Sequence, residues 1–153
     1  MEHKMLEIKA GVTAFLGVLG TFLGWKGVLV VIWGLAMALD YVSGSLAAHK
    51  NHEWDSAKAR EGLLHKGGMI LVVLVAMLFD ACLALAAEHL PVLGMEYPGL
   101  IFPVVLVWYI LTEAGSVLEN SIELGAAVPE WLSKGLKISL KTVEQAGEDG
   151  AHE

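Results

Sequence analysis

Four apolar stretches, separated by short polar segments, stand out in the hydrophobic pattern of the chain. They cover residues 10–25, 27–48, 67–87 and 99–118. Because an α-helix rises about 1.5 Å per residue, about 20 residues cross a hydrocarbon core of about 30 Å. The last three stretches have this length, whereas the first is marginal. The pattern therefore predicts an all-α integral membrane protein with three or four transmembrane helices within residues 1–128.

The first apolar stretch resembles a secretory signal in position, since it follows Lys4 and Lys9. However, the residues around Trp25 offer no cleavage site of the small-x-small type, and a second apolar stretch follows almost at once. We therefore expect a retained helix that either spans the membrane or packs as a hairpin against the second stretch. Two glycines, Gly24 and Gly27, would form the turn because glycine adopts positive φ values freely.

The polar segment before the third stretch has the features of a helix start. Asp55 and Ser56 are residue types that favour the N-cap position. They precede a run of helix-forming residues, 57–61, that leads toward the third stretch. We expect this helix to begin at the membrane surface.

The C-terminal region predicts an amphipathic helix over residues 129–143. Pro129 is favoured at a helix start, and apolar residues then recur at helical spacing on one face, with lysines on another. The apolar residues are Leu132, Leu136, Leu140 and Val143, and the lysines are Lys134, Lys137 and Lys141. Such a helix lies on an anionic inner leaflet or packs on a loop of its own protein. Residues 144–153 hold four acids and no lysine or arginine, which predicts a disordered acidic tail.

Composition supports a membrane location for most of the chain. Of the 153 residues, 56% are hydrophobic and 18% are charged, against about 25% charged in an average soluble domain. A soluble domain of this size has too little interior to bury so much apolar surface. No segment carries the basic excess that nucleic-acid binding requires. The composition therefore argues against a soluble enzyme, a disordered chain and a nucleic-acid-binding protein.

Candidate chemistry is sparse. The single cysteine, Cys82, excludes an intramolecular disulfide. His49, His52, Glu53 and His65 fall in or beside a polar loop, where solvated side chains are a better interpretation than a metal site. The common motifs of hydrolases, metalloproteases and P-loop proteins are absent. We therefore assign no catalytic residue, cofactor or metal.

Basic residues predict the orientation of the chain in the membrane. With four spans and an inner N-terminus, one basic residue, Lys26, lies outside, and nine lie inside: Lys4, Lys9, Lys50, Lys58, Arg60, Lys66, Lys134, Lys137 and Lys141. If the first stretch does not span, the counts become seven inside and three outside. Because basic residues accumulate on the cytoplasmic side, both counts place residues 49–66 and the C-terminus in the cytoplasm.

Three acids, Asp40, Asp80 and Glu113, lie within the predicted spans. A charged carboxylate at the centre of a bilayer costs at least about 2.5–3.5 kcal/mol. Asp40 and Glu113 fall at a similar depth and could share a proton, whereas Asp80 lies toward the other side and needs another polar partner. No basic residue within a predicted span is available to neutralise them. Either the acids face water in an oligomer, or the span limits are wrong by one turn.

Small residues recur at the spacing that lets helix backbones approach closely. Gly20 and Gly24 form a GxxxG motif, and Gly34 and Gly44 each precede an alanine by four residues. Such motifs mediate helix association in membranes. Together with polar residues inside the spans, they favour helices that assemble over helices that merely anchor.

A set of polar and small residues recurs in a recognisable order between residues 27 and 133. The set comprises Asp40, Gly44, Ser56, Gly62, Lys66, Glu113, Ser116, Glu119, Asn120, Gly125 and Pro129. In this order and spacing, the sequence resembles the toxin-secretion/phage-lysis holin family. One departure is His65 before Lys66, where such proteins often have two basic residues.

The resemblance implies a small phage or prophage protein that accumulates in the cytoplasmic membrane of the bacterial host. Such proteins oligomerise and open lesions through which an endolysin or, in some relatives, a toxin crosses the membrane. The endolysin is a functional partner that needs no direct contact, and the family has no catalytic residues. The expected partners are therefore the lipid bilayer and further copies of the chain.

Two other functions are compatible with the residues. A small ion or proton transporter, or a channel subunit, would use Asp40, Asp80 and Glu113 as ion sites. A membrane scaffold or toxin-antitoxin partner would use its C-terminal helix to recruit a soluble protein. Ion-selective flux without cell death would identify the transporter, and a replaceable membrane part would identify the scaffold.

Overall fold

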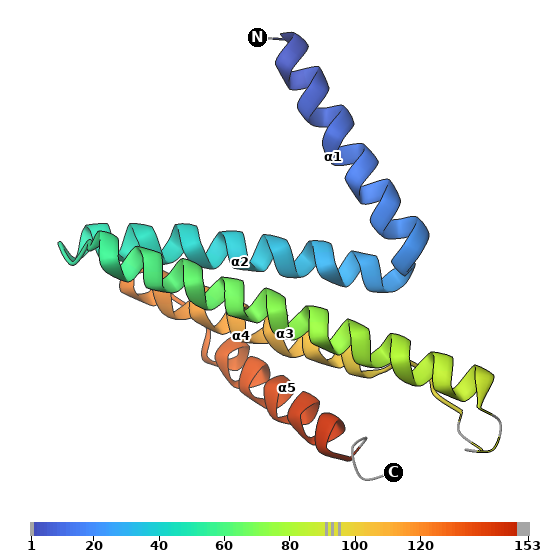
Figure 1. Cartoon of the computed structure of the whole chain (residues 1–153). Helices are drawn as coiled ribbons and strands as arrows, with labels where there is room; N and C mark the ends of the chain where they lie inside the picture. The colour runs from blue at the N-terminus through green and yellow to red at the C-terminus, as the bar shows by residue number, and fades with distance from the viewer. Residues whose placement is uncertain (1, 91, 93, 95, 150–153) are drawn as a thin grey trace.

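The chain folds into α-helices joined by short connections. The computed structural model describes residues 2–90, 92, 94 and 96–149, and this part contains no strand. The helices are α1 (Glu2–Leu23), α2 (Trp25–Lys50), α3 (Ser56–His89), α4 (Ile101–Glu123) and α5 (Glu130–Asp149) (Figure 1). Within the described chain, three helices are long and apolar enough to cross a membrane, namely α2, α3 and α4. The prediction of an all-α membrane protein is confirmed, with α1 outside this set of three.

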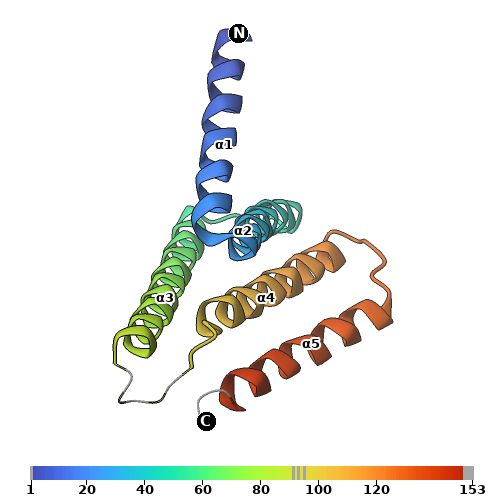
Figure 2. The same ribbon diagram turned by 90° about the vertical axis from the view of Figure 1, so that its right-hand side faces the viewer.

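Gly24 separates α1 from α2. Its φ of 54° lies in the left-handed region, which glycine adopts without the steric cost that a Cβ adds. The Gly27 amide donates to the Gly24 carbonyl, at 3.1 Å, so the chain turns where the two glycines predicted. Figures 1 and 2 both show α1 projecting away from the other helices. The alternative of a hairpin packed along α2 is therefore wrong.

Helix α3 begins well before the apolar stretch that predicted it. The Asp55 side chain accepts a hydrogen bond from the Ala57 amide, at 2.8 Å, and so caps the helix at Ser56. The expectation of a helix start in this polar segment is confirmed. One continuous helix then carries both the polar residues 56–66 and the apolar residues 67–87. This continuity decides where Lys66 lies.

Helix α4 is the centre of the packing. Figure 2 shows it between α2 and α3 on one side and α5 on the other. The buried core joins Trp33 of α2, residues of α3 such as Val73, and Phe102 and Leu106 of α4. From residue 102 to residue 118, no side chain of α4 is exposed. Helix α4 is thus enclosed by its three neighbours.

Helices α2 and α3 carry the large apolar side chains that remain uncovered. Leu35 and Leu39 of α2 are each 60% exposed, and Leu71 and Leu78 of α3 are each 64% exposed. Patches of this kind on a protein surface mark contact with a membrane or another protein. In a bilayer, these side chains would face lipid.

Two predictions for the C-terminal region differ from the structure. Residues 144–149 continue α5, so the disordered acidic tail is wrong for this segment, whereas residues 150–153 lie outside the described residues. Helix α5 also packs along α4 rather than on a loop (Figures 1 and 2). A Cβ built on Gly115 of α4 would lie 3.4 Å from Leu136 of α5, which shows how closely the two helices approach.

Candidate functional site

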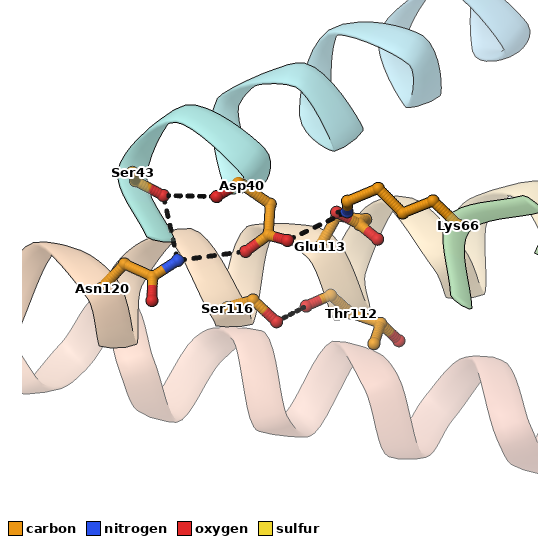
Figure 3. A network of polar contacts seen from close by, with 7 residues as sticks. All are labelled: Asp40, Ser43, Lys66, Thr112, Glu113, Ser116 and Asn120. Carbon is orange, nitrogen blue, oxygen red and sulfur yellow. Dashed lines mark hydrogen bonds and ion pairs between the residues drawn. The ribbon is translucent and has the colours of Figure 1, made fainter. Parts of the chain in front are cut away.

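A buried ion cluster joins the three membrane-spanning helices. Lys66 of α3 lies between Asp40 of α2 and Glu113 of α4 (Figure 3). Its Nζ atom is 2.9 Å from Asp40 Oδ2 and 2.5 Å from Glu113 Oε2. Glu113 is only 4% exposed. With all three groups charged, two carboxylates face one ammonium group, so the site keeps one negative charge.

The expectation that no basic residue can neutralise the spanning acids is therefore wrong. The hydrophobic pattern places Lys66 in the polar segment before the third apolar stretch. Because α3 begins at Ser56, Lys66 is instead nearly three turns inside a continuous helix, at about 3.6 residues per turn, and lies at the level of Glu113. The structure does bring Asp40 and Glu113 to one site, as their similar depth predicted. They meet through the ammonium group of Lys66.

Asn120 and Ser43 extend this arrangement, and we call the five residues Asp40, Ser43, Lys66, Glu113 and Asn120 the Lys66 cluster. The Asn120 amide donates to Asp40 Oδ1 at 3.1 Å and to Ser43 Oγ at 3.0 Å. The Ser43 hydroxyl donates to the Asp40 carbonyl at 3.1 Å. Asp40 thus receives a partner on each carboxylate oxygen, which offsets much of the cost of removing its charge from water.

Gly44 makes room for Asn120. A Cβ at this position would lie 3.4 Å from the Asn120 side-chain nitrogen, so a larger side chain would displace the amide. In the described part of the chain, no atom lies within 4 Å of a Cβ built on Gly20, Gly24 or Gly34. Of the four glycines predicted to serve helix packing, only Gly44 thus lies at a helix contact within one chain. A role of the other three in self-association stays a prediction.

Two open cavities flank the Lys66 cluster. One has a volume of about 380 Å³ and is lined by Asn120, Glu119 and the polar segment before α3. The other, of about 490 Å³, is lined by Glu113 and by aromatic residues of α4. Gly62 and Ser116 line both cavities. Water can therefore approach the cluster from two sides.

Three further motif residues shape helix ends. Ser56 is the first residue of α3. Gly125 follows α4 with a φ of 95°, a conformation that favours glycine after a helix end. Pro129 precedes α5, and its carbonyl accepts from the Leu132 amide at 3.0 Å. These residues fix the turns at the end of the bundle where the Lys66 cluster lies.

Asp80 of α3 forms a second buried site near the opposite end of the bundle. It is 8% exposed, and its Oδ1 atom accepts from the Tyr97 hydroxyl at 2.5 Å. The Ile101 and Phe102 amides donate to the same carboxylate at 3.0 and 3.2 Å. Asp80 therefore caps α4 from another helix. The expectation that Asp80 needs a polar partner of its own is met by Tyr97 and these amides.

The cap satisfies the first turn of α4 without water. The first amides of a helix have no partner inside the helix. Here Asp80 accepts from two of them, Pro103 has no amide hydrogen to donate, and the Val104 amide donates to the Leu100 carbonyl at 3.1 Å. Unpaired amides in hydrocarbon cost several kcal/mol each. This helix start is therefore compatible with a buried location.

Lys26 and Tyr97 complete what we call the Asp80 cluster (Lys26, Asp80, Tyr97 and the first turn of α4). Lys26 of α2 lies 3.7 Å from Asp80 Oδ2 and donates to the Gly99 carbonyl at 2.7 Å. Burial, followed by the hydrogen bond to Asp80, raises the pKa of Tyr97 to about 12. Tyr97 therefore stays protonated at neutral pH and remains a donor. The cluster ties α2, α3 and the α3–α4 connection together.

The described residues contain no group of three or more side chains that could hold a metal ion. Both clusters consist of carboxylates paired with lysines, hydroxyls and amides. Their chemistry is that of charge pairing inside a membrane bundle.

Comparison with known proteins identifies the family. The sequence model of the bacteriophage holin family matches residues 17–141. The chain belongs to this family. The match covers both clusters and most of α5, and it confirms the resemblance that the motif residues indicated. Membership of the holin family implies a non-enzymatic, multi-pass protein of the cytoplasmic membrane.

Several relatives of this holin-family protein are similar over most of their length. An uncharacterized protein of Clostridium perfringens strain 13 is 32% identical over 139 residues, which cover 90% of this chain and 93% of the relative. A 14.9 kDa protein from the nagH 3′ region of Clostridium perfringens is 30% identical, with 90% and 96% covered. A protein of Listeria innocua is 28% identical, with 82% and 81% covered. No solved structure matches this holin.

Proposed function

We propose that this chain is a lysis holin that oligomerises in the cytoplasmic membrane of a bacterial host and opens lesions. An endolysin, or a toxin, would cross the membrane through these lesions. The observation that carries the proposal is the Lys66 cluster, a charged site enclosed by three apolar helices and flanked by two open cavities. Membership of the holin family sets the biological context.

Charge pairing explains how a single copy can remain in the membrane. Asp80 is offset by Lys26 and by backbone amides, and Lys66 offsets Asp40 and Glu113. The remaining negative charge of the Lys66 cluster favours contact with water over lipid. Copies that assemble with their polar sites facing one another gain such water. Accumulation in the membrane would therefore favour assembly and then the opening of a lesion.

The proposed orientation places the C-terminus in the cytoplasm. With α2, α3 and α4 as the spans, the connection between α2 and α3 lies on the same side as the connection from α4 to α5. Seven of the ten basic residues then lie on this side and three on the other. The excess of basic residues marks the cytoplasmic side. Helix α1 would lie on the outer side.

The proposal is tested by inducible expression in bacteria, with and without a cytoplasmic enzyme that cleaves peptidoglycan. We expect an abrupt loss of membrane potential in both strains and lysis in the strain with the active enzyme. Membrane potential is followed with a fluorescent dye, and lysis is followed by turbidity. A catalytically inactive form of the same enzyme is the matched control.

The same experiment separates the holin from a transporter. A small ion or proton transporter would use the acids of the Lys66 cluster, which the two cavities make accessible to water. Cells that express it would keep growing and would show selective ion uptake. Steady growth with intact membrane potential at full expression would contradict the holin.

A further inference from the structure

Helix α5 doubles back along α4 instead of lying apart from the bundle. Gly115 of α4 lies against Leu136, and Val104 lies 3.8 Å from a Cβ built on Gly147. Between these contacts, the Trp108 indole donates to Glu144 at 3.1 Å. The residue numbers rise in α5 as they fall in α4, so the two helices are antiparallel. Contact extends over twelve residues of α4, or about 16 Å.

The two faces of the docked α5 differ in polarity. The half-buried face toward α4 includes Leu136, Leu140 and Val143. All seven charged side chains of α5 are exposed, namely Glu130, Lys134, Lys137, Lys141, Glu144, Glu148 and Asp149. In the described part of α5, Lys134 forms an ion pair with Glu130 at 3.2 Å. The outer face of α5 therefore carries mainly exposed charged and polar side chains, together with the exposed side chains of Trp131 and Ile138.

This arrangement is incompatible with lipid on the outer face of α5. The contact covers residues 104–115 of α4, which lie inside a membrane-spanning helix. Each charge placed at that depth against lipid costs at least about 2.5–3.5 kcal/mol. In contrast, the outward faces of α2 and α3 carry exposed leucines that suit lipid. The molecule thus has a lipid-compatible side and, opposite it, a water-compatible side formed by α5 (Figure 2).

We infer that α5, docked on α4, lines the aqueous lumen of the assembled lesion. This inference rests on the proposed lesion-forming function. The lipid-compatible face of α2 and α3 would form the outer wall, and the charged face of α5 would be in contact with the water column. Before assembly, α5 lies on the inner leaflet, where its leucines enter the lipid and its lysines face the headgroups. Docking of α5 therefore accompanies lesion opening, and it carries the end of the helix at Gly147 from the cytoplasmic side to the level of Val104, near the outer end of α4.

Cross-linking tests whether α5 is docked on α4 in open lesions. Gly115→Cys and Leu136→Cys are combined in a Cys82→Ser chain and treated with a short bismaleimide during induction. We expect a low cross-linked fraction before the loss of membrane potential and a several-fold increase at that moment. The matched control combines Gly115→Cys with Ile138→Cys, which is 67% exposed and lies about 200° around the helix from Leu136, and should lose the cross-link.

Thiol modification tests whether the outer face of α5 lines the lumen, and it remains informative if the double-cysteine chain fails to fold. Single cysteines, Lys141→Cys on α5 or Leu78→Cys on α3, are introduced into the Cys82→Ser chain. Each protein is reconstituted in vesicles of phosphatidylethanolamine and phosphatidylglycerol that contain a fluorescent dye. We expect a negatively charged thiol reagent to change the rate of dye release several-fold for Lys141→Cys and to leave Leu78→Cys unchanged.

The outcomes separate this inference from the proposed function. Lysis without an increase in cross-linking overturns the lumen-lining role of α5 and leaves the holin function intact. The same conclusion follows if the thiol reagent leaves dye release unchanged for both Lys141→Cys and Leu78→Cys. A high cross-linked fraction before opening, together with blocked lysis, also overturns it, because α5 would then have to leave α4. Failure of the Cys82→Ser parent to lyse cells contradicts the holin function and the inference with it.

Discussion

The two buried carboxylate clusters of this holin are stabilised in different ways. In the Asp80 cluster, two backbone amides, a tyrosine hydroxyl and a lysine converge on one carboxylate. In the Lys66 cluster, side chains from three helices meet, with one lysine between two carboxylates. Backbone amides are fixed by the helix that bears them, whereas a lysine side chain is long and flexible. The Asp80 cluster is therefore a rigid clamp, and the Lys66 cluster is a contact that helix movement can open.

The largest effect is expected when Lys66→Met removes the cation of the Lys66 cluster. Two buried carboxylates then lose their charged partner, and we expect unfolding to become easier by about 3–5 kcal/mol. The measurement is the unfolding of purified protein in detergent, together with the amount of protein in membranes. Lys58→Met, on an exposed part of the same helix, is the matched control.

A triple variant sharpens this prediction. Adding Asp40→Asn and Glu113→Gln to Lys66→Met removes the unpaired charges and should restore most of the stability. Equal stability of Lys66→Met and Lys58→Met would mean that the ion pairs contribute nothing to the bundle.

The Asp80 cluster is expected to respond less strongly to Asp80→Asn. The variant keeps one acceptor oxygen but presents an amide nitrogen to one of the two α4 amides, so we expect a loss of about 2–3 kcal/mol. Unfolding in detergent measures the loss, and the time of lysis in cells should change more than the amount of inserted protein. Asp55→Asn, which preserves an N-cap residue type at α3, is the control. If Asp80→Asn reduced the amount of inserted protein by as large a factor as it changed the time of lysis, the role of Asp80 as a clamp between helices would be contradicted.

Tyr97→Phe isolates one hydrogen bond of the Asp80 cluster and should cost about 1.5 kcal/mol. The folded protein holds the pKa of Tyr97 at about 12, above the value near 10 of an unfolded tyrosine. Because the unfolded chain releases its proton first, the contribution of Tyr97 is complete below pH 10 and is lost as the pH rises to about 12. Unfolding curves of both proteins between pH 9 and pH 12, an interval set by these values, should converge at the alkaline end. A constant difference would rule out this role of the hydroxyl.

Asn120→Leu is expected to have the smallest effect, about 1 kcal/mol. The variant removes the donor to Asp40 and Ser43 but leaves the ion pair with Lys66 in place. Unfolding in detergent should place it between the wild type and Lys66→Met. If Asn120→Leu were as damaging as Lys66→Met, the amide rather than the ion pair would hold α2 against α4.

Local pattern was sufficient to predict the helices and the start of α3. Apolar stretches of about 20 residues indicated α2, α3 and α4, and Asp55 has the residue type and position of an N-cap. The shared depth of Asp40 and Glu113 also followed from their positions in the spans. These features depend on residues that are close in sequence, or on the position of a residue along its span, which sets its depth in the membrane.

The partners of the acids could not be read in this way. Lys66 stands at the edge of an apolar stretch, and its assignment to a loop depended on a boundary set by hydropathy alone. Its contact with Glu113 joins residues on different helices, and Asp80 caps a helix that begins after a connecting segment. Likewise, the amphipathic pattern of α5 revealed an apolar face but not that α4 would cover it. Such contacts depend on the packing of distant segments.

The position of the Asp80 clamp has a consequence for biogenesis. During synthesis, α3 leaves the ribosome before Tyr97 and the first turn of α4, so Asp80 reaches the insertion machinery without the groups that later surround it. Of its final partners, Lys26 alone has already been made. The two helices are therefore expected to partition into the bilayer together, as one hairpin, once the second has emerged. A nascent chain that stops before residue 101 should leave α3 poorly integrated.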